Sequence, residues 1–310
     1  MDGNDVLKKI GLLIGVAACG ALVTSCGGGD PEPTPTPTET ATPTPTPTTS
    51  GVFDLTAAFQ ASSTNANLIY AYFTPTGGAE TFNDASRLNG VANVSLAFDP
   101  ETATFLFPDL PDPVTYDSAD LVSSSSTSRV YAEGDTSLTL ELPFSEVLRV
   151  TYEIDDQAFT RNSTAGTLRS QRVALFLNNV TTTADITSTL TYTGTPVVAG
   201  GEPGVTPAGA VTSQATTFTI TPGTDDTVTA TITIFQTVGG ATTQVAQFAI
   251  NEELGANGGF SGAIDDTTNG LKGVFAGGLA GANREELVLI FSLANADDGR
   301  EYVGTLIADR

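Results

Sequence analysis

The chain lacks the residues on which many catalytic and metal sites depend. Among its 310 residues there is no histidine and no tryptophan, the single methionine is Met1, and the two cysteines are Cys19 and Cys26. Zinc sites built from cysteine and histidine are therefore excluded, as are Ser-His-Asp and Cys-His relays. We expect no catalytic residues of these kinds, no metal site and no cofactor.

Positive charge is scarce as well. The chain has 12 lysines and arginines against 35 aspartates and glutamates, a net charge of −23 at pH 7. Such a surface repels polyphosphate and has few cations with which to release counterions, so nucleic acid is not an expected partner. The simplest interpretation is a solvated surface that stays soluble at high density on a membrane. A cationic partner is the alternative.

An export signal is present at the N-terminus. Lys8-Lys9 precede the apolar stretch Ile10–Val23, which is shorter than the roughly 20 residues a spanning helix needs and suits a signal peptide. The stretch ends in Val23-Thr24-Ser25-Cys26, followed by three glycines. This order resembles the lipobox of bacterial lipoproteins, in which the cysteine becomes the acylated first residue. We therefore expect a signal peptide over residues 1–26, lipidation at Cys26 and an outer-membrane protein held by its lipid and exposed at the cell surface.

Two other interpretations of this segment remain. A second box ends at Cys19 but leaves only a short hydrophobic core before it. An ordinary secretory signal cleaved nearby would leave an unpaired thiol in the exported chain.

A linker follows over residues 27–50. Threonine and proline alternate from Pro31 to Pro47, which favours polyproline II and supplies no apolar residues for a core. An extended spacer of this kind reaches roughly 60–75 Å at about 3.1 Å per residue. It would hold the folded body away from the lipid surface.

From Val52 onward the pattern predicts an all-β protein, apart from a short helix near Ala119–Ser126. In Thr227–Phe235 threonines alternate with apolar residues, as in a strand with one buried face. Over residues 171–310 the pattern predicts an antiparallel meander that closes into an eight-stranded barrel, with an open sandwich as the alternative. The expected strands are Thr187–Thr195, Thr216–Thr221, Thr227–Gln236, Thr243–Asn251, Gly259–Ile264, Gly270–Phe275, Glu286–Leu293 and Glu301–Ala308.

Residues 51–170 are less regular and are expected to form a separate β-rich domain, with the boundary near residue 170. The serine run Ser123–Ser126 is expected to be a loop. The expected strands are Leu68–Phe73, Val94–Phe98, Thr104–Phe107, Ser137–Leu142 and Leu148–Ile154.

Part of the C-terminal sequence resembles a known family. The runs Gly258–Gly262, Gly273–Gly277, Ala282–Glu286 and Phe291–Leu293 are similar, in order, to the barrel domain of transferrin-binding protein B-like surface lipoproteins. The resemblance covers roughly residues 185–310. It implies a handle-like domain joined to an eight-stranded barrel, display at the bacterial surface, and binding of a host iron protein, haem or another solute. It carries no binding residue across.

Tyr70 and Tyr72 are the candidate ligand-binding residues. They are two apart in an expected strand and so share one face, where they could stack on a ligand; with no histidine, cysteine or methionine in the body, a haem would depend on tyrosine. Cross-strand packing is the alternative role. The acidic doublets Asp155-Asp156, Asp225-Asp226, Asp265-Asp266 and Asp297-Asp298 could bind calcium, but most of them are expected to serve turns.

The sequence therefore predicts a non-enzymatic, lipid-anchored surface protein that binds an extracellular protein or small solute. A structural lipoprotein that coats the envelope without a specific ligand is the first alternative. A hydrolase based on two carboxylates is the second; it would need a cleft that brings the two together.

Overall fold

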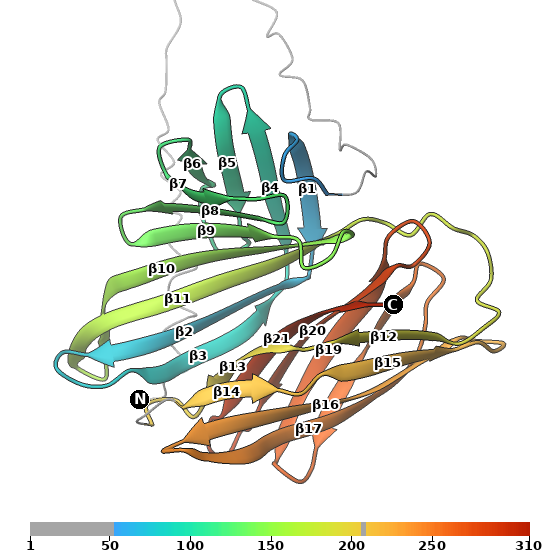
Figure 1. The fold of residues 1–310 in the computed structure, drawn as a ribbon. Coiled ribbons are helices and arrows are strands. Elements are labelled where there is room, and N and C mark those ends of the chain that lie inside the picture. The colour runs from blue at the N-terminus through green and yellow to red at the C-terminus, as the bar shows by residue number, and fades with distance from the viewer. Residues whose placement is uncertain (1–52, 206–208) are drawn as a thin grey trace, which may run out of the picture. The chain divides into compact units, whose positions relative to one another are not determined.

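A computed structural model describes residues 53–205 and 209–310. These residues belong to one compact unit, and every regular element described in it is a β-strand (Figure 1). The prediction of an all-β protein is confirmed. Cys26 and the linker lie outside the described residues. Within the described residues the chain has no helix that could cross a lipid bilayer.

The strands form three antiparallel sheets (Figure 1). The first sheet has the order β1 (Phe59–Thr64), β4 (Val91–Phe98), β5 (Glu101–Leu106) and β6 (Val114–Asp117). The second sheet has the order β3 (Thr81–Leu88), β2 (Asn67–Pro75), β11 (Thr164–Leu177), β10 (Val147–Arg161), β9 (Thr136–Glu141), β8 (Ser128–Glu133) and β7 (Leu121–Ser124).

The third sheet contains the eight strands expected in the C-terminal part, in the sheet order β17 (Ala241–Glu253), β16 (Thr227–Val238), β15 (Thr216–Thr221), β12 (Leu190–Gly194), β21 (Glu301–Asp309), β20 (Glu286–Ala294), β19 (Leu271–Ala280) and β18 (Gly259–Asp266). Two short strands extend it, β13 (Val197–Gly201) on β21 and β14 (Ala210–Ser213) on β16.

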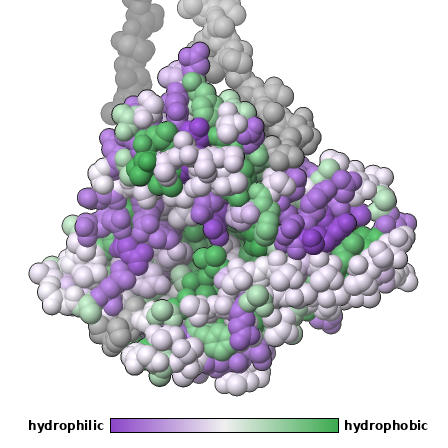
Figure 2. All heavy atoms as spheres, in the orientation of Figure 1, coloured by the Kyte–Doolittle hydropathy of each residue, from purple (hydrophilic) through white to green (hydrophobic). Residues whose placement is uncertain are grey.

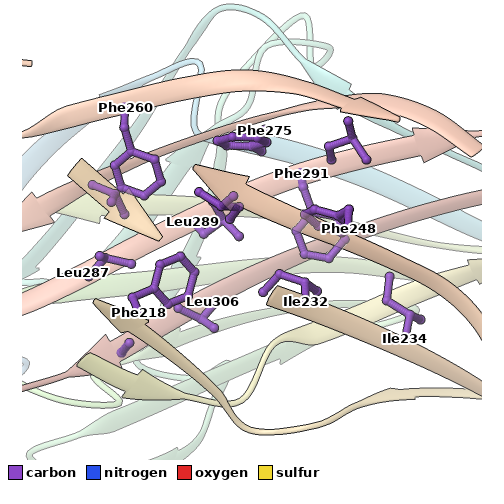
Figure 3. Packing of buried hydrophobic residues seen from close by; sticks show 14 of the residues in the cluster. Phe218, Ile232, Ile234, Phe248, Phe260, Phe275, Leu287, Leu289, Phe291 and Leu306 are labelled. Carbon is purple, nitrogen blue, oxygen red and sulfur yellow. The ribbon is translucent and has the colours of Figure 1, made fainter. Parts of the chain in front are cut away.

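The third sheet curves around its own side chains. One buried cluster receives residues from all eight of the main strands (Figure 3). The two strands at the ends of the sheet order, β17 and β18, are consecutive in the chain, and the Gln247 N–H donates to Asp266 Oδ2 between them at 2.7 Å. No ladder pairing between β17 and β18 occurs in the described part of the chain, so this buried carboxylate makes the contact instead.

Glycine and phenylalanine face each other across neighbouring strands in this core. The cross-strand partners are Gly262 and Phe275, Gly277 and Phe260, and Gly304 and Phe291. In each pair the ring covers the glycine: a Cβ added at Gly277 would lie 2.3 Å from the Phe260 ring. A small, tightly curved sheet can hold large rings only where the facing residue is small. The rings are seen in Figure 3.

Three further clusters hold the sheets together. The largest lies between the first and second sheets and includes Phe105, Tyr131 and Phe176. Two smaller clusters join the other face of the second sheet to the outer face of the third, one around Leu68 and Val303 and one around Leu175 and Val288. The second sheet is therefore the middle layer of the body.

The helix expected near Ala119–Ser126 is wrong. Asp117 and Asp120 form a turn in which the Ala119 N–H donates to Asp117 Oδ1 at 2.6 Å, and Leu121–Ser124 then form β7. Aspartate favours such a turn because its side chain bonds the backbone two residues on. Half of the serine run belongs to β7 as well, so the expected loop starts at Ser125. The division into domains at residue 170 stays a prediction.

Candidate ligand-binding site

The site is built on the face of the second sheet that points toward the third. Alternate residues of a strand point to opposite faces, and in β10 Val150 and Tyr152 belong to the core shared with the first sheet. Arg149 and Thr151 lie on the other face, together with Tyr70 and Gln171, which are cross-strand neighbours on β2 and β11. The candidate residues therefore share one surface.

A cavity of about 190 Å³ lies between this face and the strands β13 and β21. Its apolar lining includes Leu68, Val173, Val197, Val198, Ala199 and Val303. Val197 is 53 % exposed, so the cavity opens to solvent on the β13 side. Figure 2 shows hydrophobic residues that reach the surface between hydrophilic areas on this side of the molecule.

Polar groups lie at defined places in this lining. Arg149 donates from Nε and Nη2 to a single oxygen of Glu141, Oε2, at 3.0 and 2.8 Å. Thr305, only 3 % exposed, lines the cavity from β21, and Thr151 lines it from β10. The cavity thus combines an aliphatic wall with an ion pair and neutral hydrogen-bonding groups, which is the usual composition of a small-molecule site.

Of the two candidate tyrosines, only Tyr70 lines the cavity. Its hydroxyl donates to Gln171 Oε1. Tyr72 lies beside it, with ring centroids 6.1 Å apart and an interplanar angle of 87°, so the two do share one face as expected. The Tyr72 ring also packs edge-on against Phe82, its cross-strand partner, and lies under the Arg169 guanidinium at 4.8 Å. Tyr72 therefore serves packing.

The protonation of the tyrosines bears on iron chemistry. Burial raises the pKa of Tyr70 to about 12, and burial also raises the pKa of Tyr72. Burial has the same effect on the pKa of each of the five other tyrosines, Tyr116, Tyr131, Tyr152, Tyr192 and Tyr302. A tyrosine that ligates haem iron does so as the phenolate, and these environments disfavour that form.

Two carboxylates, the buried Glu286 and the half-buried Glu301, lie at the contact between the second and third sheets. Glu286, 1 % exposed, accepts the N–H groups of Ser145 and Glu146 through Oε1, each at 2.7 Å. Burial raises the pKa of Glu286, and the charges of Glu146 and Asp309 raise it further. Glu301 accepts the N–H of Ala85 at 2.8 Å, and its pKa is also raised by burial and by Asp84. Glu146, Glu286, Asp84 and Glu301 are not among the lining of the cavity. Glu286 and Glu301 join the third sheet to the segment before β10 and to β3 through the N–H groups that they accept.

Three of the four acidic doublets occupy turns and strand ends, whereas Asp155-Asp156 lies inside β10 at a bulge between Ile154 and Gln157. Asp266 accepts the N–H of Asn269, and Asp298 accepts both the N–H and Nε of Arg300. Asp226 accepts the N–H of Gly223. In the part of the chain that the structure describes, no group of three acidic residues is arranged to hold a metal ion.

Sequence patterns alone could not find most of this site. Arg149, Gln171 and Thr305 each occupy a β-strand. The only available signal was polarity on the face of β10 and β11 opposite the buried residues, and β11 was not expected as a strand. Which strands of the third sheet face this surface depends on packing between distant segments.

No family model matches the chain, and no curated protein does. Matching solved structures include transferrin binding protein B from serogroup B Neisseria meningitidis, at 13 % identity over 75 % of this chain and 52 % of that one, with a TM-score of 0.40. A mutant of that protein from Haemophilus parasuis Hp5 matches at 12 % identity over 75 % and 54 %, with a TM-score of 0.40. The N-lobe domain of lactoferrin binding protein B of Moraxella bovis matches at 12 % identity over 79 % and 99 %, with a TM-score of 0.35.

The chain spans about half the length of these two transferrin binding protein B structures. Similarity at this level assigns the chain neither to a family nor to a ligand.

Proposed function

We propose that the chain is a non-enzymatic, lipid-anchored bacterial surface protein whose β-sheet body binds a protein or a small solute outside the cell. The observation that carries this proposal is the order of features along the sequence. An apolar stretch ends at Cys26, a proline-threonine spacer follows, and an acidic body begins after it. This order suits a protein tethered by lipid and held away from the membrane.

The cavity between the second and third sheets supports the binding part of the proposal. It is lined by both apolar and polar residues, and its opening faces solvent at Val197. An iron carrier, haem or a similar solute is the ligand class that the sequence resemblance implies. The raised pKa of Tyr70 weighs against direct ligation of iron by this residue. We therefore favour a protein or an organic solute as the ligand over iron that is bound directly by this tyrosine.

Metabolic labelling with a fatty acid tests the anchor. The full-length chain, Cys26→Ser and Cys19→Ser are expressed in the same bacterium, and label and membrane association are measured. We expect wild type and Cys19→Ser to be labelled and to sediment with membranes, because the acyl chains are attached at Cys26. We expect Cys26→Ser to carry no label. Equal labelling of Cys26→Ser and wild type, or label lost only from Cys19→Ser, would contradict the assignment.

A further inference from the structure

We propose that the cavity between the second and third sheets binds a small apolar α-amino acid of the size of valine or leucine. The inference rests on the proposed function, since the amino acid would be met outside the cell. It is carried by the volume of the cavity, the aliphatic wall, and the ion pair that lies beside that wall.

Volume limits the ligand. At about 190 Å³ the cavity is smaller than the roughly 300–1,000 Å³ of sites for drug-sized molecules. One water molecule takes up about 30 Å³ of the liquid, so the volume of the cavity equals that of roughly six water molecules. Haem and peptides are too large for it, whereas a free amino acid with a branched side chain is of the right size.

The aliphatic lining of the cavity favours an apolar side chain on the bound amino acid. Leu68 and Val173 come from the second sheet, and Val197, Ala199 and Val303 from the third, so the ligand would be held between two aliphatic surfaces. These surfaces offer no partner to a polar side chain. Burial of a branched aliphatic group between them is favourable because it removes apolar area from water.

The ion pair selects the charges of the ligand. Both bonds from Arg149 end on Glu141 Oε2, which leaves Nη1 of the arginine and Oε1 of the glutamate without a partner among the described residues. The two side chains are cross-strand neighbours on β10 and β9 and both line the cavity. One can therefore pair with a carboxylate and the other with an ammonium group of the same molecule. A zwitterion adds no net charge to a protein whose own charge is −23.

Two neutral groups complete the set of contacts. The Tyr70 hydroxyl donates to Gln171 Oε1, which fixes the amide and leaves its N–H groups as donors beside the cavity. Thr305 is 3 % exposed and lines the cavity, yet its hydroxyl has no hydrogen-bond partner among the described residues. The hydroxyl can therefore donate to or accept from a polar ligand atom at this place.

Calorimetric titration of the full-length protein in detergent tests the proposal. The ligands are L-leucine, 4-methylpentanoate, which lacks the ammonium group, and 3-methylbutylamine, which lacks the carboxylate. We expect saturable binding of leucine and at least about tenfold weaker binding of each analogue, because each leaves one charge of the pair unmatched. No saturable heat with millimolar leucine, or equal affinity for an analogue, would overturn the proposal.

Variants locate the binding. Arg149→Gln and Glu141→Gln should each weaken leucine binding by about tenfold or more. Arg169→Gln is the matched control: Arg169 is ion-paired to Glu80 on the same face of the sheet but does not line the cavity, and its affinity should stay within about twofold of wild type. Equal losses in Arg149→Gln and Arg169→Gln would show binding elsewhere and would overturn the site.

The two proposals can fail separately. Leucine binding without fatty acid label at Cys26 would remove the lipid anchor and leave the amino acid site in place. Label at Cys26 without leucine binding would overturn the site alone, and a protein captured from the medium by the displayed chain would then identify the ligand as macromolecular.

Discussion

Glu286 shows how a single buried side chain couples the sheets of this protein to pH. It accepts two backbone N–H groups from the segment before β10, while its second oxygen, Oε2, is buried and has no partner in the described ranges 53–205 and 209–310. Burial and the nearby acidic groups raise its pKa. The charged form is therefore less favourable in the folded protein than in the unfolded chain, and this penalty is present at neutral pH.

The first prediction concerns this residue. Because the folded pKa lies above the unfolded value of about 4.3, the penalty disappears as the pH falls through the folded pKa toward the unfolded one. Glu286→Gln keeps the accepting oxygen and removes the charge. We expect its melting temperature to exceed that of wild type at pH 8, and the difference to shrink as the pH approaches 4.5.

Thermal unfolding followed by circular dichroism measures both chains across this range. Glu253→Gln is the control, because Glu253 is exposed at the end of β17 and should show no such pH trend. A Glu286→Gln protein that is less stable than wild type at pH 8, or a difference independent of pH, would show that the carboxylate is favourable as an anion.

The sequence also predicts that Tyr70 and Tyr72 share one face of a strand, but it does not predict which residues each side chain contacts. Spacing of two in a strand fixes a shared face. Tyr70 reaches the cavity and Tyr72 does not, because Tyr72 lies one pair further along β2, opposite Arg169 and Phe82. Their partners come from strands distant in sequence, and no local pattern contains that information.

At the scale of elements, the glycines of the third sheet are explained by the rings that cover them. Gly277 and Gly278 are adjacent in β19 and differ in surroundings. A Cβ at Gly277 would lie 2.3 Å from the Phe260 ring and 2.6 Å from the Val288 carbonyl oxygen, whereas a Cβ at Gly278 would lie 3.6 Å from its nearest neighbour. Only the first glycine is required by the packing.

Alanine substitutions test this difference. We expect Gly277→Ala to destabilise the protein by about 1–3 kcal/mol, because the ring and the backbone must both shift. In a body of this size that lowers the melting temperature by roughly 2–4 °C per kcal/mol. Gly278→Ala is the control and should be neutral or slightly stabilising, because alanine restricts the unfolded chain. Equal losses in the two variants would contradict the Gly–Phe pairing as the cause.

The strands themselves were predictable where one face is apolar and the other polar. All eight main strands of the third sheet were expected, and Thr216–Thr221 has the expected bounds. β11 was missed because Arg169-Ser170-Gln171-Arg172 places polar residues on both faces of the strand, so the alternation of apolar and polar residues is broken. β13 was missed because it ends in two glycines, which are depleted in strands.

At the scale of the whole molecule, the body is a stack in which each layer covers a face of the next. The second sheet packs on the first through one face and on the third through the other, and the cavity is lined by residues of the contact around Leu68 and Val303. Composition could predict the sheets but not this stacking, because every sheet has an apolar face and nothing in the sequence says which faces meet.

The acidity of the chain is also a property of the whole molecule. The chain has 12 lysines and arginines against 35 aspartates and glutamates, and the net charge of −23 repels polyanions. The linker over residues 27–50 contains no lysine or arginine. Trypsin therefore has no site in it, and a protease of broad specificity is needed to test this segment.

Proteinase K treatment of intact cells is the most direct test of the central claim that this body is displayed outside the cell on a lipid anchor. We predict that brief treatment releases the folded body into the supernatant as a fragment that begins after Cys26, while a periplasmic marker stays intact. A chain that is degraded only after the outer membrane has been permeabilised would contradict surface display and place the body inside the envelope.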